Sequence, residues 1–273
     1  MSHRFTIPFQ DITLSAISWE VDQPRALLCL IHGLGEHSER YAHVAAAFNE
    51  IGISVFATDL PGHGRTTGKK GHSNEEQLLG TIDKLYERAR QVDPDLPMFI
   101  YGHSMGGNIV LRYLLTSPLQ PFKAAIVTSP WIELTEKPPA FKFALAKIVK
   151  NIYPKYTDRT KLNAGFISRN ENEVKKYMED PLVHDYITTE LFFTIMNNGQ
   201  WILHDSPALS IPILLMHGEE DKLTSHEATK KLAERKDKHV TLRIWENGYH
   251  ELHNDINKEE VIKFAVDWIS TYI

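Results

Sequence analysis

Short apolar segments alternate along most of the chain with segments of helical periodicity. The apolar segments, which predict strands, are 26–31, 53–58, 98–101, 124–128, 213–217 and 241–245. Between them, apolar residues recur at three- and four-residue spacing, and this predicts helices over 40–50, 75–92, 108–115, 227–235 and 259–272. Such alternation predicts a mostly parallel sheet with helices on both faces, and therefore the α/β class.

Two regions depart from this pattern. The first 25 or so residues predict a pair of exposed antiparallel strands at one edge of the sheet. Residues 131–205 contain no clear strand–helix unit, yet they are too many for a loop without structure. We therefore predict that 131–205 is an inserted helical cap, here termed the cap segment, and that 1–130 and 206–273 form the core.

Within the cap segment, the stretch FKFALAKIVKNIY at 141–153 has the pattern of an amphipathic helix. Its lysines at 142, 147 and 150 lie largely off the apolar face. That face is formed by Phe141, Ala144, Leu145, Ile148, Val149 and Ile152. Three roles for the face remain open at this point: it lines an acyl channel, it lies on a lipid surface with its lysines toward anionic head groups, or it packs on the core.

Composition narrows the class of partner. Apolar residues make up 42% of the 273 residues, the formal net charge is −5, and no stripe of Lys and Arg suggests nucleic acid as the main partner. The single cysteine, Cys29, excludes a disulfide framework or a cysteine zinc site within one chain. No stretch approaches the roughly 18 apolar residues of a membrane span, and the first residues lack the apolar region of a signal peptide. We therefore expect a cytoplasmic protein.

The stretch YGHSMGG at 101–107 places Ser104 between Gly102 and Gly106, directly after a predicted strand and before a predicted helix. Strand, serine turn and helix in this order form a nucleophile elbow, where side chains at the two glycine positions would collide with the strand or the helix. The backbone N–H of Met105 then lies at the helix N-terminus, where it can donate to a developing oxyanion.

A serine hydroxyl is a weak nucleophile unless a base and an orienting carboxylate activate it. In this arrangement the acid and then the histidine follow the serine along the chain. Three acids follow the strand 213–217, namely Glu219, Glu220 and Asp221, and two histidines, His250 and His253, follow the strand 241–245. We predict Asp221 and His250, since both follow strands that end at the same edge of the sheet as the elbow.

The loop LIHGLGEHSERY at 30–41 supplies the second oxyanion donor. Such a donor comes from the loop after an earlier core strand, and the Gly33-Leu34-Gly35 backbone is flexible enough to turn an amide inward. We assign this donor to the N–H of Leu34.

Taken together, the motifs HGLGEHSERY, DLPGHGRTTG, GHSMGG, HGEEDKL and NGYHELHND resemble the monoacylglycerol lipase and lysophospholipase-like group of α/β-hydrolases, a serine aminopeptidase S33-type family. The match runs along nearly the whole core and is weakest in the cap segment. The resemblance implies an α/β-hydrolase fold with Ser104 as nucleophile, Asp221 as acid, His250 as base and the amides of Leu34 and Met105 as oxyanion donors.

The resemblance also implies a lipid ester as substrate, cleaved through an acyl-enzyme without a metal or an organic cofactor. We expect monoacylglycerol first, with a lysophospholipid or a general carboxylic ester as the alternative. Peptide cleavage, or a non-catalytic ligand-binding role, is favoured less. A transient contact of the cap with a membrane surface stays open, as does the oligomeric state.

Other motifs suggest different classes but fit less well. A dinucleotide-binding unit has a similar pattern to one stretch of this chain: Gly33, Gly35 and Ser38 follow a strand, and Asp59 ends the next strand. However, Ser38 stands where that unit has its third glycine. That interpretation also gives GHSMGG and His250 no role. The stretch GRTTGKK at 64–70 is one residue shorter than a Walker A motif. The stretch HELH at 250–253 is one residue shorter than the motif of a zinc-protease helix. A serine nucleophile excludes the dehalogenase and epoxide hydrolase routes, which attack with Asp.

Overall fold

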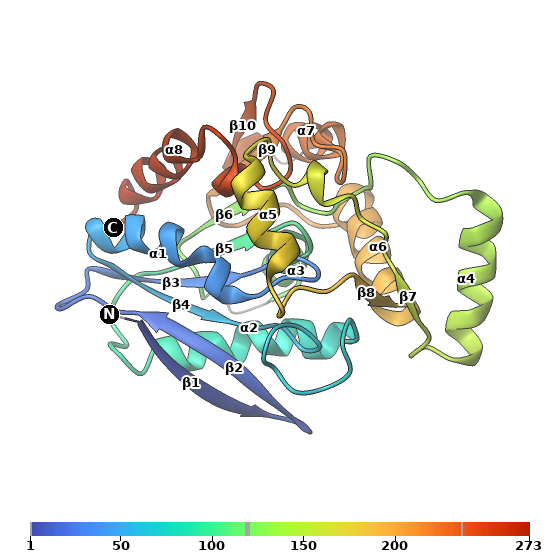
Figure 1. Ribbon diagram of the computed structural model, residues 1–273. Helices are drawn as coiled ribbons and strands as arrows, with labels where there is room; N and C mark the ends of the chain where they lie inside the picture. The colour runs from blue at the N-terminus through green and yellow to red at the C-terminus, as the bar shows by residue number, and fades with distance from the viewer. Residues whose placement is uncertain (1, 118–120, 236) are drawn as a thin grey trace.

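The computed structural model describes residues 2–117, 121–235 and 237–273, and its centre is an eight-stranded sheet (Figure 1). The strand order is β1-β2-β4-β3-β5-β6-β9-β10. From β4 to β10 all neighbours pair in parallel, whereas β2 pairs antiparallel with both β1 and β4. The strands are β1 (Ser2–Phe9), β2 (Ile12–Trp19), β3 (Ala26–Ile31), β4 (Ile53–Thr58), β5 (Met98–His103), β6 (Ala124–Thr128), β9 (Ile213–Gly218) and β10 (Val240–Trp245).

Helices cover both faces of the sheet and make it the middle of three layers. The core helices are α1 (Ala42–Glu50), α2 (Glu75–Ala89), α3 (Met105–Thr116), α7 (His226–Arg235) and α8 (Lys258–Ser270). Successive side chains of a strand point to opposite faces, so Leu27 and Cys29 of β3 pack with α2 and α3, whereas Leu28 and Leu30 pack with α1 and α8. Fully buried central strands account for the continuous apolar segments of the sequence.

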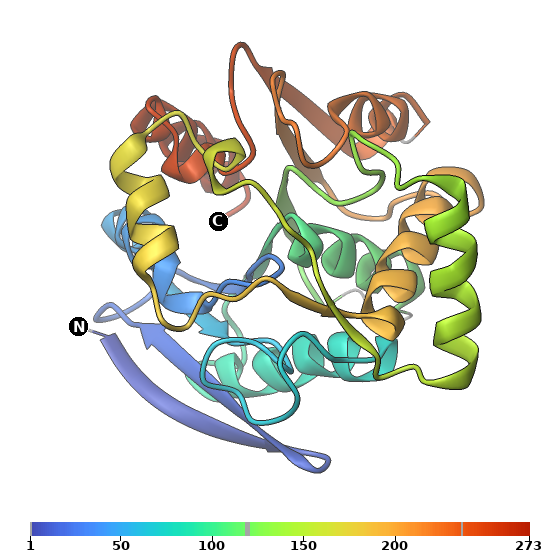
Figure 2. The same cartoon turned by 45° about the vertical axis from the view of Figure 1, so that its right-hand side comes forward.

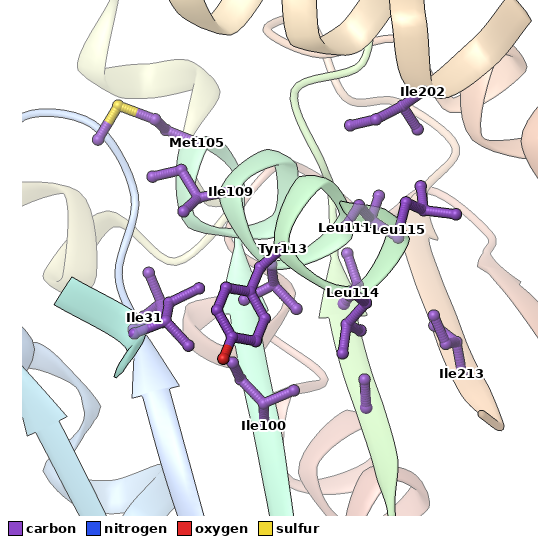
Figure 3. Close-up of a cluster of buried hydrophobic side chains, with 14 of the residues drawn as sticks. Ile31, Ile100, Met105, Ile109, Leu111, Tyr113, Leu114, Leu115, Ile202 and Ile213 are labelled. Atoms are coloured by element: carbon purple, nitrogen blue, oxygen red, sulfur yellow. The ribbon is translucent and has the colours of Figure 1, made fainter. Parts of the chain in front are cut away.

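Helix α3 is the most deeply buried helix of one core cluster. It lies on the sheet and under a further helix, α6 (Thr189–His204), whose Ile202 faces it (Figure 3). The strand residues Ile31, Ile100 and Ile213 close the cluster from below. Because α3 begins at Met105, this packing fixes the backbone that directly follows Ser104.

The predicted α/β architecture is confirmed, including the antiparallel pair at the N-terminal edge. The differences are at the ends of elements and in the burial of β2. This strand was predicted to be exposed, yet residues 16–19 are buried where it pairs with β4. The strand predicted over 98–101 continues to His103, and the helix after it begins at Met105, so that only Ser104 separates the two. The helix predicted over 40–50 begins with a 3₁₀ turn at Ser38–Tyr41 before α1.

Between β6 and β9 the chain leaves the sheet and forms the elements of the cap segment. These are α4 (Ala140–Ile152), β7 (Thr157–Arg159), α5 (Glu171–Glu179), β8 (Tyr186–Thr188) and α6, with β7 and β8 paired antiparallel. Helix α6 packs on α3 and shares its apolar cluster. Helix α4 lies on the outer side of α6, at the margin of the molecule in both views (Figures 1 and 2).

The orientation of α4 rules out one of the three roles that the sequence left open for its apolar face. Phe143 packs edge-to-face against Phe193 of α6, with ring centroids 5.0 Å apart. Most of the predicted apolar face points away from α6: Phe141, Leu145, Ile148 and Ile152 are 57–79% exposed. The interpretation that this face packs on the core is therefore wrong for these four residues. No helix of the described residues is long and apolar enough to cross a membrane.

Candidate active site

Ser104 occupies a strained turn between β5 and α3. Its backbone has φ 54° and ψ −116°, a conformation that a side-chain-bearing residue adopts only when its surroundings impose it. A Cβ atom on Gly102 would lie 2.7 Å from the carbonyl oxygen of Gly106, and one on Gly106 would collide with the backbone of Ile31 and His32. The two glycines thus let strand, turn and helix approach closely enough to form the elbow.

The structure brings the predicted serine, histidine and aspartate into one hydrogen-bonded chain. Ser104 Oγ lies 2.9 Å from His250 Nε2, and His250 Nδ1 lies 2.6 Å from Asp221 Oδ2. All three side chains are buried or nearly so. Each residue directly follows a strand or lies in a loop beyond one (β5, β9 and β10), so the parallel sheet delivers all three to the same edge.

The electrostatics of this chain favour a histidine that accepts a proton. Burial acts to lower the pKa of His250, but the negative charge of Asp221 and its hydrogen bond outweigh burial and raise that pKa. For Asp221, burial acts to raise the pKa, and His250 and His217 together hold it well below its usual range. Asp221 is therefore a carboxylate at neutral pH, and Nδ1 of His250 carries the proton between them. This leaves His250 Nε2 as the acceptor for the Ser104 hydroxyl.

Asp221 receives more hydrogen bonds than the sequence indicated. Its Oδ1 accepts from the backbone N–H groups of Leu223 and Thr224. Its Oδ2 lies 2.6 Å from His250 Nδ1, 2.9 Å from the Thr224 hydroxyl and 3.0 Å from His217 Nε2. Sequence reasoning missed both Thr224 and His217. A histidine four residues before an acid at a strand end was the only signal for the second of these.

The loop after β3 lies against the elbow at the predicted oxyanion position. A Cβ on Gly33 would come within 3.2 Å of Ser104 Cβ, and the Gly33 N–H donates to Glu36 Oε1 at 2.7 Å. The next amide along the chain is that of Leu34, whose side chain is half-buried, while the N–H of Met105 opens α3. Within the described residues neither of these two amides donates to a protein acceptor.

A buried ion cluster joins this loop to the loop that carries His250. The Arg40 guanidinium donates to Glu36 Oε2 at 2.6 Å and to both oxygens of Glu251 at 2.8 and 2.7 Å. Glu36 also accepts from the Tyr41 hydroxyl. Burial acts to raise the pKa of Glu36, but Arg40 and its other neighbours lower it to about 2. The sequence analysis used this loop only for its amides, although Glu36 and Arg40 are four residues apart.

The cap segment is tied to both of these loops. His184 N–H donates to the carbonyl oxygen of Gly35, and His37 Nε2 lies 2.8 Å from Asp180 Oδ2. On the other side, Arg169 Nε donates to the buried carboxylate of Asp255 at 2.9 Å. The base of the cap segment is thus held by the loops that carry the candidate site, unlike α4, which has no buried residue.

The competing candidates lie elsewhere. Glu219 and Glu220 are exposed, and His253 packs between other rings, 4.7 Å from that of Tyr41. Asp59, the residue that the dinucleotide interpretation required for a ribose, is buried and accepts from the Ser38 N–H and hydroxyl at 2.9 and 2.6 Å. Its carboxylate fixes two loops and is not open to a nucleotide.

A mostly parallel eight-stranded sheet with a serine on a strand–helix elbow is the architecture of the α/β-hydrolase class. The model of the family described as serine aminopeptidase, S33, matches residues 22–257, and the chain belongs to this family of α/β-hydrolases. The expected resemblance is confirmed.

Relatives and solved structures agree with this assignment. A monoacylglycerol lipase from Mycolicibacterium smegmatis is 30% identical over 93% of this chain and 92% of its own. The crystal structure of a monoacylglycerol lipase from Paleococcus ferrophilus has a TM-score of 0.88 at 33% identity, covering 95% of this chain and 99% of that chain. An uncharacterized abhydrolase domain-containing protein of Dictyostelium discoideum is 36% identical over 96% of this chain, which spans only 28% of that protein's length.

Proposed function

We propose that this protein is a serine hydrolase that cleaves carboxylic esters of lipids, monoacylglycerol first, through an acyl-enzyme. The observation that supports this most is the chain of two hydrogen bonds from Ser104 through His250 to Asp221. In this proposal Ser104 is the nucleophile, His250 the base and Asp221 the residue that orients His250.

The reaction follows from the positions of these groups. Ser104 Oγ attacks the acyl carbonyl carbon while His250 Nε2 takes its proton, and the oxyanion accepts hydrogen bonds from the amides of Leu34 and Met105. Collapse of this intermediate breaks the bond to the alcohol, which leaves with the proton from His250. Water, deprotonated by the same His250, then attacks the acyl-enzyme, and the fatty acid is released. Asp221 stabilises the imidazolium in both halves of the reaction.

Monoacylglycerol is proposed as substrate because the family relatives that match over nearly their whole length include proteins named for this activity. The exposed face of α4 supports a lipid over a small soluble ester. Four large apolar side chains on one helix are unusual on a surface that meets only water.

We further propose that α4 contacts the membrane surface from which the substrate is taken. Its apolar side chains Phe141, Leu145, Ile148 and Ile152 would enter the boundary between head groups and acyl chains, and Lys142 and Lys147, both exposed, would lie near anionic head groups. Location in the cytoplasm stays a prediction from the sequence.

Hydrolysis of glycerol monoesters with acyl chains from two to sixteen carbons tests the substrate proposal. We expect kcat/KM to rise with chain length, and we expect Ser104→Ala to lose nearly all turnover for every ester. Flat activity across the series would refute a lipid substrate, and lysophospholipids measured beside the glycerol esters decide which head group is preferred. Residual activity of Ser104→Ala equal to that of the unchanged protein would refute the assigned nucleophile.

A further inference from the structure

Two imidazoles share one oxygen of Asp221. His250 Nδ1, of the ring that reaches Ser104, lies 2.6 Å from Oδ2, and His217 Nε2 lies 3.0 Å from the same oxygen. His217 belongs to β9 and is fully buried. Nothing in the reaction proposed above requires this second histidine.

The neighbours of His217 fix which of its nitrogens carries a proton. Nε2 faces two acceptors, Asp221 Oδ2 and the carbonyl oxygen of Thr224 at 3.1 Å, so this nitrogen must be protonated. Nδ1 lies 2.8 Å from the hydroxyl of Thr229 on α7, which is also buried. His217 is therefore held from one side by α7 and donates on the other side to the carboxylate.

We propose that His217 is a positioning residue for the catalytic base: its Nε2 proton occupies part of the Asp221 Oδ2 lone-pair density and so limits how strongly that oxygen holds the Nδ1 proton of His250. Each further donor to this oxygen, the Thr224 hydroxyl at 2.9 Å included, leaves less free negative charge toward His250. His217 thereby keeps the proton affinity of His250 lower than an otherwise identical dyad would have.

This proposal predicts a direction for the pH dependence of catalysis. Without the hydrogen bond from His217, Asp221 binds the imidazolium form of His250 more tightly, so the pKa of His250 rises further. Only part of the free energy of this bond to a charged oxygen differs between the two protonation states of His250. We therefore expect about a three- to tenfold change in the proton-binding constant, or roughly half a pH unit to one. The acid limb of kcat/KM, where His250 must lose its proton to act as base, therefore moves to higher pH by this amount.

A substitution of His217 leaves the other charged and titratable groups around this pair in place. His226, on α7, has its ring 6.4 Å from that of His217 and pairs with Glu227 at the surface. Around His250 lie Asp221, Glu36, Glu251 and His103, whose ring is 4.9 Å away. Burial, reinforced by His250, lowers the pKa of His103 to about 3, so His103 stays neutral in the range of the experiment.

The test compares two amides at position 217. In His217→Asn the amide reaches the position of Nδ1 and retains the contact with Thr229, but it is too short to reach Asp221. In His217→Gln the amide reaches the position of Nε2 and can still donate to Asp221. Both are assayed with p-nitrophenyl butyrate, a soluble ester that does not depend on α4, and kcat/KM is measured from pH 5 to pH 9. The midpoint of the acid limb does not depend on how much of the enzyme is folded, provided that the folded fraction is the same at each pH.

We expect the midpoint of His217→Asn to rise by about half a pH unit to one, and that of His217→Gln to stay near the unchanged protein's. His226→Asn, the matched control, leaves the midpoint unchanged. If His217→Asn does not fold, Thr229→Val tests the same contact from the other side and raises the midpoint by a smaller amount. An acid limb that stays in place or moves downward in His217→Asn, or that moves equally in the Asn and Gln variants, overturns the proposal.

This inference rests on the proposed function, and the two can fail separately. If the unchanged protein shows no hydrolysis that Ser104→Ala removes, the proposed function fails. If hydrolysis depends on Ser104 but the midpoint of the acid limb of kcat/KM is the same in the variants at position 217, only the proposed role of His217 fails.

Discussion

Arg40 is the residue whose replacement is expected to cost the most stability for a change outside the hydrophobic core. Its guanidinium is bonded to Glu36 and Glu251, and both carboxylates are almost inaccessible to solvent. Arg40→Met removes the charge but keeps most of the side-chain volume, so two buried carboxylates lose the cation that pairs with them. Breaking a buried ion pair from one side costs about 3–5 kcal/mol, which for a chain of this size lowers Tm by roughly 6–20 °C.

The loss should also depend on pH, with a sign that the structure determines. In the native protein the pKa of Glu36 is depressed to about 2, so Glu36 contributes stability above the pKa of the unfolded chain and loses it only in strong acid. Without Arg40, burial loses its largest opposing charge, and we expect the pKa of Glu36 to rise above its unfolded value. The carboxyl group must then be neutral or pay for a buried charge, so Arg40→Met is destabilised more at pH 8 than at pH 5.

Urea unfolding at pH 5 and pH 8 measures this directly, from the change in midpoint at constant m value. Arg159→Met is the matched control, since Arg159 pairs with Asp185 on the surface with both side chains well exposed. That pair should contribute at most about 1 kcal/mol at either pH. Equal losses in the two variants, or an Arg40→Met loss that shrinks from pH 5 to pH 8, would refute the reasoning about the buried cluster.

Three further outcomes follow from the structure. In the unchanged protein, the acid limb of kcat/KM should have its midpoint above about 6.5, because Asp221 raises the pKa of His250; a midpoint well below 6.5 would contradict that raised pKa. The double variant Phe141→Ser, Ile152→Ser should bind vesicles of phosphatidylcholine and phosphatidylserine about tenfold or more weakly in a sedimentation assay. Each of the two side chains exposes apolar area, and burying that area in the lipid contributes on the order of 1–2 kcal/mol. The equally exposed Met178→Ser, on α5, should bind as the unchanged protein does, and equal weakening by both would argue against docking through α4. Gly106→Ala should lower Tm by several degrees and reduce hydrolysis, because the added methyl collides with the backbone of β3. Unchanged Tm and activity in this variant would show that the elbow accommodates a methyl group at position 106.

The sequence was most informative about the residues that follow the parallel strands, because the sheet topology brings them together at one edge. In a parallel sheet all strands end at the same edge, so residues that follow 98–101, 213–217 and 241–245 had to meet there once those segments were recognised as strands. That placement, together with the glycines around Ser104, was enough to choose Asp221 over two adjacent acids and His250 over a nearby histidine.

The sequence was less informative about contacts between distant side chains. Helical periodicity showed that α4 has an apolar face but could not show which residues α6 covers, and Phe143 rather than the predicted face makes that contact. In the sequence, His217 cannot be distinguished from any other histidine within an apolar strand. Its contact with Asp221 exists only because the turn after β9 brings Asp221 back toward the strand. The cluster around Arg40 was hidden because Glu251 is distant in the sequence.

The central claim is that the Ser104 hydroxyl is activated by His250, and labelling with a fluorophosphonate tests it most directly. Intact mass followed by peptide mapping should find one label, on Ser104. Labelling should be absent in Ser104→Ala and slowed by orders of magnitude in His250→Ala, because the serine then lacks its base. A label of equal rate and extent in the unchanged protein and in Ser104→Ala would contradict the account.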